Sequence, residues 1–373
     1  MDFEKFIKLF KFCITSQNLR RVSGDPPQLK IIFIFLTFAM FIFIYFAINN
    51  ISKIMEEDNI DYMRVLFTSL LCFGCCELLF KNFGMVPLHK EVESLLNWIQ
   101  DLRVKVEKDE IIQKVSKEEF AKALKYSVLF FKTYLGLYMM TGVFVALNFT
   151  FCNYLVIAIP GLDQESTGFI HRFVPILFTE IAASWTVSSD SAIVFIGIYV
   201  IFFMRSVNRL INIFAENSEI TNRPRFLICI IEKHIEMIRI LEVFNECMKF
   251  ISLMQLCFST LTFLVILFVI QLFPDNLLLY SMLITLLTQL GLLCFFGEIV
   301  RSESEEIFIN LYQTNWYDLS LKEQRIILLM MANSCKVIGL KAGGLYEIGL
   351  MSLVQIVKLS ASYAAIIMTF TQK

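Results

Sequence analysis

Long runs without a charged residue constrain this chain more than any other feature of its sequence. Three runs are unambiguous, covering Ile31–Ser52, Thr133–Leu162 and Phe250–Pro274, and a fourth covers Asn276–Gly297. A helix needs roughly 20 apolar residues to cross a hydrocarbon core of about 30 Å, so each run predicts a membrane-spanning helix. The Pro274-Asp275-Asn276 turn between the last two runs predicts a helical hairpin.

Three further segments have membrane length but contain charged residues. They are Val65–Phe80, Pro175–Met204 and Ile348–Phe370. Composition favours the same class, because hydrophobic residues make up 57% of the chain and charged residues 18%, against about 45–50% and 25% in soluble proteins. The prediction is an all-α polytopic membrane protein with seven transmembrane helices, and the odd number places the two chain ends on opposite sides.

The distribution of Lys and Arg predicts the orientation, because basic residues near span ends are retained in the cytoplasm. Of the 33 basic residues, 27 lie before the first span or in the second, fourth and sixth connections. We therefore expect the N-terminus inside and the C-terminus outside. The first run begins near Ile31, has full span length and lacks a small-residue cleavage site, which predicts an uncleaved signal anchor.

The long inner connections have amphipathic patterns. Residues 88–125 and 206–249 place apolar side chains between charged ones at helical spacing, which predicts long cytoplasmic helical extensions. Such apolar faces need partners. Either the extensions pack on one another beneath the membrane, or they form the contacts of an oligomer.

Enzymatic and metal chemistry find little support in the sequence. The three histidines fall in three different connections, and the sequence has no H-x-x-E-H, G-x-S-x-G or P-loop pattern. Cys72, Cys75 and Cys76 contain a C-x-x-C spacing within an apolar helix, which favours a buried thiol cluster over zinc. We expect no enzymatic activity, no cofactor and no metal. Asn148-Phe149-Thr150 is a glycosylation sequon that adjoins the third span.

Four charged residues within the predicted spans need an explanation, because ionisable groups at membrane depth are costly and usually face a cavity or an aqueous path. For Glu77 and Lys358 we favour positions near the inner ends of their helices, from which the side chains reach the lipid headgroups. For Glu180 and Asp190 the location in the fourth span favours an internal polar contact. The sequence does not name the partner.

A set of motifs occupies the last third of the chain. These are Tyr312, the Trp316-Tyr317 pair, a helix over Ile326–Ala332, the glycine-containing turn Lys341–Gly344, and a last span with Gln355-Ile356-Val357-Lys358 and Ser362-Tyr363. Together they resemble the C-terminal signature of insect odorant receptors. Insect gustatory receptors share that fold, but their last span carries a Thr-Tyr followed by a Gln-Phe. Thr369 stands where that Gln would lie, so the odorant branch fits better.

The resemblance implies an odorant-binding subunit of a ligand-gated, non-selective cation channel. Such a subunit assembles with the odorant receptor co-receptor into a heterotetramer in the plasma membrane of olfactory sensory neurons. Its other partners are a small volatile organic ligand, membrane lipid and permeant cations, and nothing points to nucleic acid. By the same resemblance, residues 1–300 hold the first six spans and the ligand pocket, while residues 301–373 hold a cytoplasmic anchor helix and the pore-lining last span.

The resemblance also assigns roles to individual residues of the last third. It places Ser362, Ile366 and Thr369 in the pore, with Ile366 at the apolar gate and Thr369 at the outer mouth. The subunit anchor comprises Tyr312, Trp316, Tyr317, Lys358 and Tyr363.

Ligand recognition is expected in the outer halves of the spans, where aromatic and aliphatic walls can hold an apolar volatile. The candidates are Phe67, Leu70, Tyr138, Gly142, Val145, Phe178, Ile181, Trp185, Ser188, Tyr280 and Ile284. Tyr138, Trp185 and Tyr280 are preferred, because each can offer a hydrogen bond from an apolar surface. Simple packing is the alternative for every one of them.

Three alternative functions stay open. A gustatory-receptor-like channel would share the fold. A G-protein-coupled receptor would need the opposite orientation. A secondary transporter could couple through Glu180 and Asp190, although the sequence has no visible internal repeat.

Overall fold

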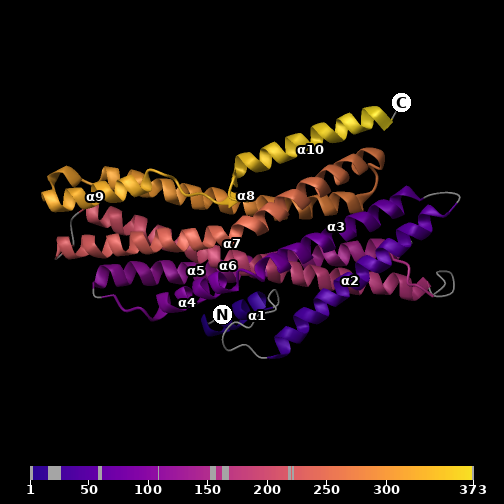
Figure 1. Ribbon diagram of the computed structural model, residues 1–373, viewed down its shortest axis with the longest axis horizontal. Coiled ribbons are helices and arrows are strands. Elements are labelled where there is room, and N and C mark those ends of the chain that lie inside the picture. Colours follow the sequence, from indigo (N-terminus) through magenta and orange to yellow (C-terminus); the bar gives the residue numbers. More distant parts are fainter. Residues whose placement is uncertain are drawn as a thin grey trace.

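The protein is built from long helices that run side by side along one axis, as the computed structural model shows (Figure 1). The structure describes residues 3–15, 27–57, 61–107, 109–151, 157–161, 168–216, 220 and 222–371. These residues form α1 (Phe3–Thr15), α2 (Pro27–Met55), α3 (Tyr62–Met85), α4 (His89–Val104), α5 (Glu110–Phe151), α6 (Gly168–Glu216), α7 (Arg223–Leu272), α8 (Leu277–Gln313), the 3-10 helix η1 (Trp316–Asp318), α9 (Leu321–Ser334), the strands β1 (Lys341–Ala342) and β2 (Tyr346–Glu347), and α10 (Leu350–Thr371).

Seven of the described helices are long and apolar enough to cross a membrane, which confirms the predicted number of spans. They are α2, α3, α5, α6, α7, α8 and α10. Helix α7 has 50 residues, about 75 Å at 1.5 Å per residue, so it extends far beyond a hydrocarbon core of about 30 Å. The predicted helical extensions are therefore present, while their side of the membrane stays a prediction.

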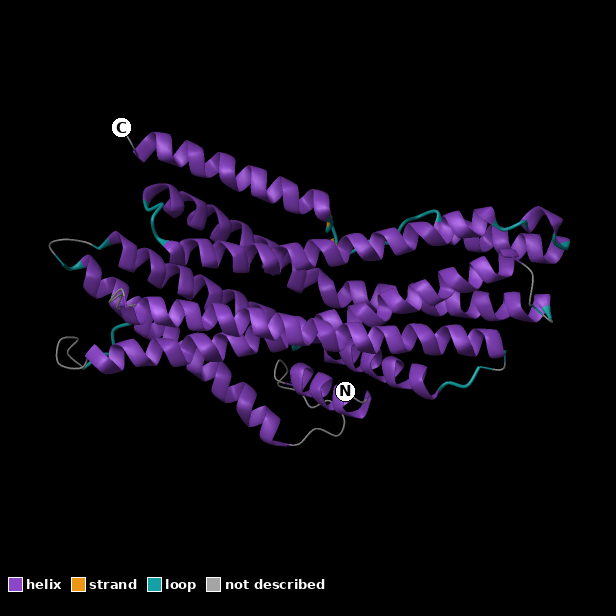
Figure 2. Ribbon diagram, turned by 180° about the vertical axis from the view of Figure 1, so that it is seen from behind, coloured by secondary structure: helices purple, strands orange, loops and turns teal. Residues whose placement is uncertain are grey.

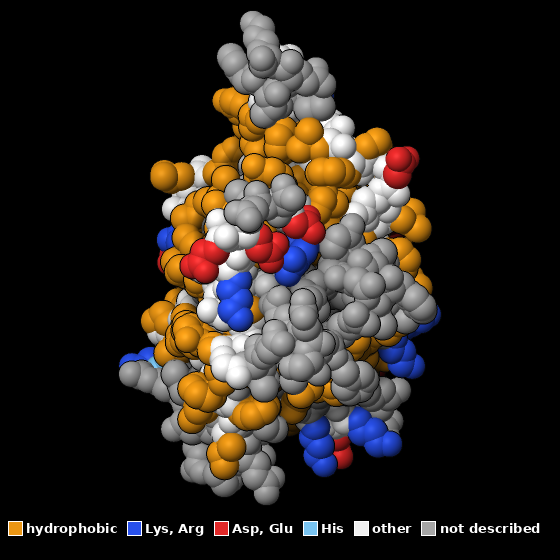
Figure 3. Space-filling model, turned by 90° about the vertical axis from the view of Figure 1, so that its right-hand side faces the viewer, with side chains coloured by type: hydrophobic (Ala, Val, Ile, Leu, Met, Phe, Trp, Pro, Cys, Tyr) orange, Lys and Arg blue, Asp and Glu red, His pale blue; other side chains and the backbone are white. Residues whose placement is uncertain are grey.

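We call the end of the molecule that holds the α7–α8 turn the distal end, and the end that holds α9 the basal end (Figure 1). At the distal end α7 stops at Leu272, and the Asn276 side chain accepts a hydrogen bond from the Leu278 N–H at 3.1 Å to begin α8. The predicted hairpin at this turn is confirmed. Hydrophobic side chains dominate the described surface visible at this end (Figure 3).

The third span is shorter than the sequence predicts. Helix α5 ends at Phe151, and residues 157–161 are not helical, with a turn at Pro160-Gly161 in which Gly161 has a φ of 81°. Ala158 instead packs against α2, where its N–H donates to the Phe46 carbonyl at 3.3 Å. An apolar run alone does not reveal this end, because a non-helical segment packed on a neighbouring helix is as apolar as a helix.

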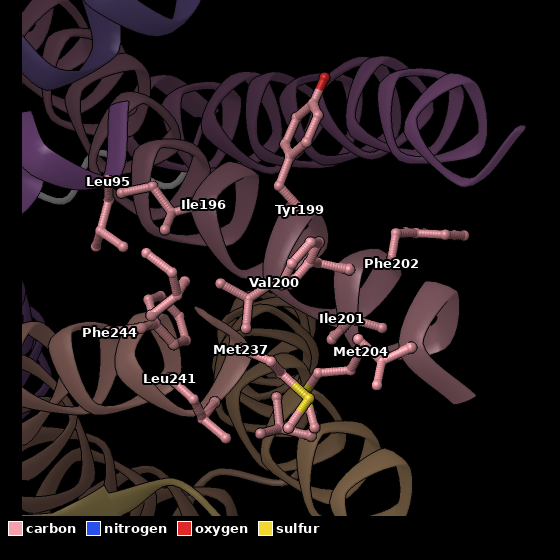
Figure 4. Close-up of a cluster of buried hydrophobic side chains, with 14 of the residues drawn as sticks. Leu95, Ile196, Tyr199, Val200, Ile201, Phe202, Met204, Met237, Leu241 and Phe244 are labelled. Carbon is pink, nitrogen blue, oxygen red and sulfur yellow. The ribbon is translucent and has the colours of Figure 1, made fainter. Parts of the chain in front are cut away.

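The basal end is a helical bundle with its own hydrophobic core. Helices α4, α6 and α7 supply the residues labelled in Figure 4. Among them, Leu95, Val200 and Phe244 are each at most 1% exposed. Helix α1 covers this core on one side, with Phe6 and Phe10 fully buried against Phe195 of α6. The predicted amphipathic faces thus pack on one another within the chain.

A short hairpin connects this bundle to the last helix. Strands β1 and β2 pair antiparallel across Gly343 and Gly344, whose φ angles of 60° and 76° favour glycine. The Gly343 N–H donates to the Lys249 carbonyl of α7 at 2.9 Å. The Glu298 carboxylate of α8 then accepts from the Leu350 N–H at 3.1 Å and caps the start of α10.

Helix α10 packs on α7 and α8 along one side and diverges from the other helices toward its C-terminal end (Figures 1 and 2). Its buried side carries a residue at every fourth position, namely Ser352, Ile356, Ser360 and Ala364. Small residues at this spacing let two membrane helices approach closely.

Candidate functional site

A cavity of about 240 Å³ lies among the membrane-length helices α2, α3, α5, α6, α7 and α8. Most of its wall is apolar, and its polar groups come from threonines and from one group of side chains at one end. That end is formed by Glu77 and Lys81 of α3, Gln289 of α8 and Tyr138 of α5. An apolar cavity with a few converging polar groups is the usual form of a small-molecule site.

Five of the predicted ligand contacts line this cavity. They are Leu70, Tyr138, Gly142, Val145 and Phe178. Gly142 leaves room for the Glu180 carboxylate beside the wall, since a Cβ at this position would lie 2.7 Å from the Glu180 Oε1 atom. Glu180 itself is half-buried. The role of these residues in ligand binding stays a prediction.

Four other candidates lie in the packing around the cavity. Phe67 and Trp185 are 0% and 2% exposed within an apolar cluster, and the half-buried Ile181 packs against the same cluster. Ser188 is buried in α6, two residues beyond the last cavity-lining position of that helix, Thr186. These four positions lie in the packing that the sequence left open as the alternative, and their role in ligand binding stays a prediction.

Tyr280 and Ile284 lie outside the cavity, which differs from the expectation that they close it. They are 37% and 59% exposed, whereas Met282 and Thr285 of the same helix line the wall. Successive side chains of an α-helix point in directions that differ by about 100° around the helix axis. An error of one position in the helical phase therefore moves Ile284 away from the cavity that Thr285 faces.

The charged end of the cavity is a buried ion cluster. The Lys81 Nζ atom lies 2.9 Å from Glu77 Oε1 and 3.3 Å from Asp190 Oδ1, and the Lys81 side chain is 1% exposed. The Tyr134 hydroxyl donates to Asp190 Oδ2 at 2.6 Å, and the Gln289 amide donates to Glu77 Oε1 at 3.0 Å. Four helices, α3, α5, α6 and α8, meet at this cluster.

The cluster corrects two interpretations of the sequence and confirms a third. Glu77 does not reach the lipid headgroups, because it is buried against Lys81 and Gln289. Lys81 lies within α3 and is buried, so the second span does not end at Phe80 as the sequence predicted, and Lys81 is not one of the basic residues of the connection that follows. Asp190 makes the expected internal contact, and the structure names Lys81 and Tyr134 as its partners. A signal was present, because opposite charges four residues apart on one helix are neighbours.

The predicted pore residues share one side of α10. Ser362, Ile366 and Thr369 are all exposed in the single chain, with spacings of four and three residues, and lie away from the buried Ala364. Lys358 and Tyr363 are exposed as well. An exposed stripe that combines apolar and hydroxyl groups on a membrane-length helix requires either lipid, a partner helix or water beside it.

The predicted anchor residues before α9 are also largely exposed. Tyr312 and Tyr317 are 65% and 63% exposed, and Trp316 is half-buried in the 3-10 helix. The Gln324 amide donates to the Tyr317 carbonyl at 2.8 Å and fixes this turn on α9. The division at residue 300 falls inside α8 and stays a prediction. The side chain of Asn148 lies outside the described residues.

Seven membrane-length helices that surround an apolar cavity define a multi-pass membrane protein. A family model described as "7tm Odorant receptor" matches residues 59–361. This chain therefore belongs to the odorant receptor family.

Individual relatives agree with this assignment. Odorant receptor 33a of Drosophila melanogaster is 21% identical over 366 residues, which cover 95% of this chain and 94% of that receptor. Odorant receptor 33b of the same species is 26% identical over 143 residues, and this match spans 37% of this chain and 38% of that receptor. Odorant receptor 85c matches at 21% identity over 49% of its own length.

Solved structures share the fold at low sequence identity. The olfactory receptor OR5 from Machilis hrabei in complex with eugenol aligns with a TM-score of 0.78 at 10% identity, covering 98% of both chains. The structure of the same receptor described without eugenol gives a TM-score of 0.77. At this identity the likeness establishes the seven-helix fold.

Proposed function

We propose that this chain is the odorant-binding subunit of a ligand-gated, non-selective cation channel, assembling with the odorant receptor co-receptor in the plasma membrane of olfactory sensory neurons. The observation that carries the proposal is the apolar cavity of about 240 Å³ among the membrane-length helices, with few polar groups. Such a cavity suits a small volatile organic molecule. The orientation with the N-terminus inside, predicted from the basic residues, belongs to the same proposal.

A route from the cavity to the last helix supports gating. Gln289 of α8 holds Glu77 at the charged end of the cavity, and its carbonyl accepts from the Gln255 amide of α7 at 3.4 Å. Two residues further along α8, Gly291 faces Leu353 of α10, which lies 3.9 Å from the position of an added Cβ. A ligand that favours one position of α8 would therefore favour one position of α10, provided that it binds the open state more tightly.

In this proposal the exposed side of α10 faces a water-filled pore, where Ile366 forms the apolar gate and Thr369 the outer mouth. The exposed residues around Tyr312 and Tyr317 contact other subunits. Membrane lipid covers the remaining apolar surface of the spans.

Patch recording tests the proposal. Cells that express this chain with the co-receptor, with each alone, or with neither are exposed to a panel of neutral volatiles. We expect a cation current, and we expect the set of volatiles that evoke it to depend on the presence of this chain. Responses that need a G protein, or substrate uptake without current, would contradict the channel.

A further inference from the structure

The charged end of the cavity has an excess of negative charge. Glu77 and Asp190 each carry a carboxylate, and Lys81 supplies one ammonium group between them. Both oxygens of Asp190 are engaged, Oδ1 by Lys81 and Oδ2 by the Tyr134 hydroxyl. The unbalanced negative charge therefore lies at Glu77, because Glu77 lines the cavity and Asp190 does not.

Glu77 has accepting capacity to spare toward the cavity. The Lys81 ammonium and the Gln289 amide both approach its Oε1 atom, at 2.9 and 3.0 Å. A carboxylate has about four acceptor positions on its two oxygens. A donor inside the cavity could bind Oε2 without displacing either protein contact.

The Tyr138 hydroxyl is a second polar group at this end of the cavity and lies beside the Tyr134 hydroxyl. Tyr138 is 7% exposed and lines the cavity, and its buried hydroxyl makes no hydrogen bond of good geometry with any residue that the structure describes. The neighbouring Tyr134, with ring centroids 4.7 Å apart, donates its own hydroxyl to Asp190. Buried hydroxyl groups usually find a partner, so one from the cavity is expected.

We infer that this cavity selects ligands that carry a protonated amine, which donates to Glu77 and Tyr138 while the apolar part of the ligand packs against Phe43 and Phe178. This inference rests on the proposed odorant-binding function and deepens it. An ammonium group would neutralise the excess charge, which is costly inside a membrane. A carboxylate ligand would add to it, and the Lys81 ammonium is already held by two carboxylates.

The size of the cavity limits the rest of the ligand. A cavity of 150 Å³ binds benzene, so one of about 240 Å³ suits about ten non-hydrogen atoms by proportion. The rings of Phe43 and Phe178 lie 5.2 Å apart and form an aromatic part of the wall. A small aromatic or aliphatic primary amine fits both the volume and the wall, and its ammonium, with a pKa near that of lysine, about 10.4, stays protonated at neutral pH.

The test compares 2-phenylethylamine with 2-phenylethanol, which has the same shape without the charge. The purified full chain is heated with each probe at pH 7, and affinity is obtained from the rise in melting temperature with probe concentration. We expect the amine to bind more tightly. In Glu77→Gln the affinity for the amine should fall about tenfold or more, while the affinity for the alcohol stays within about twofold. The exposed Glu305→Gln is the control and should keep the wild-type preference.

Tyr138→Phe is a second variant that removes the hydroxyl and keeps the ring. Tyr138→Phe should lower the affinity for the amine more than the affinity for the alcohol. This comparison keeps the test decisive if Glu77→Gln fails to fold. The inference is overturned if the wild-type chain binds the alcohol equally well or better, if neither probe stabilises it, or if Glu77→Gln keeps the preference for the amine. Volatile-evoked currents under the co-receptor conditions above would still report separately on the proposed function.

Discussion

Removing the ammonium of Lys81 should destabilise the whole membrane domain. In Lys81→Met the carboxylates of Glu77 and Asp190 lose a contact at 2.9 and 3.3 Å in a site where the lysine side chain is 1% exposed. Breaking a buried ion pair by removing one partner costs about 3–5 kcal/mol, because a charge is left uncompensated. At about 2 °C per kcal/mol, the melting temperature should fall by about 6–10 °C.

The triple variant Glu77→Gln, Lys81→Met, Asp190→Asn separates this reasoning from a simple loss of packing. It removes all three charges together, and replacing a complete buried ion cluster is often close to neutral. We therefore expect the triple variant to melt above Lys81→Met. The control is Lys322→Met, an exposed lysine at the start of α9, which should melt with the wild type.

The assay is thermal unfolding of the detergent-solubilised chain, followed by size-exclusion chromatography of the fraction that stays monodisperse. The reasoning is refuted if Lys81→Met melts within about 2 °C of the wild type, or if the triple variant is less stable than Lys81→Met.

Three further predictions concern other parts of the chain. Gly142→Leu should abolish volatile-evoked current at normal surface expression, measured by patch recording, because the new side chain would collide with Glu180 and displace the helices at the cavity wall. Gly297→Ala should lower the melting temperature by several degrees, because its Cβ would overlap the Ile348 carbonyl; an unchanged melting temperature would contradict that contact. Burial raises the pKa of the Cys13 thiol to about 11, so at pH 8 its thiolate fraction is about 100-fold below that of an ordinary thiol. Iodoacetamide followed by peptide mass spectrometry should therefore label the exposed Cys335 long before Cys13, and equal labelling in the folded chain would contradict the burial.

The spans could be predicted from the sequence because membrane thickness sets a length that an uncharged run either reaches or does not. The hairpin at Pro274-Asp275-Asn276 could also be predicted from the sequence, since these three turn-forming residues separate two uncharged runs. The end of α5 could not be predicted, because residues 157–161 continue the uncharged run but are not helical, and Ala158 packs on α2.

The cavity was harder to predict, because helices that are apolar on every side give no signal for the side that faces inward. The expected residues of α5 line the cavity wall, whereas the side chains of Tyr280 and Ile284 in α8 point away from the cavity. The ion cluster depends on Asp190, which lies 109 residues from Lys81 in the chain. The spacing of Glu77 and Lys81 was visible, but their third partner could only come from the fold.

Cysteine modification within α10 tests the proposed channel most directly. Ile366→Cys and Ala364→Cys are each expressed with the co-receptor, and a charged methanethiosulfonate reagent is applied during a volatile-evoked current. Ile366 is 49% exposed, whereas Ala364 is fully buried on the opposite side of the same helix. We predict a lasting change in current for Ile366→Cys and none for Ala364→Cys. Current that is evoked normally and unaffected at Ile366, or altered equally at both positions, would contradict a pore lined by this side of α10.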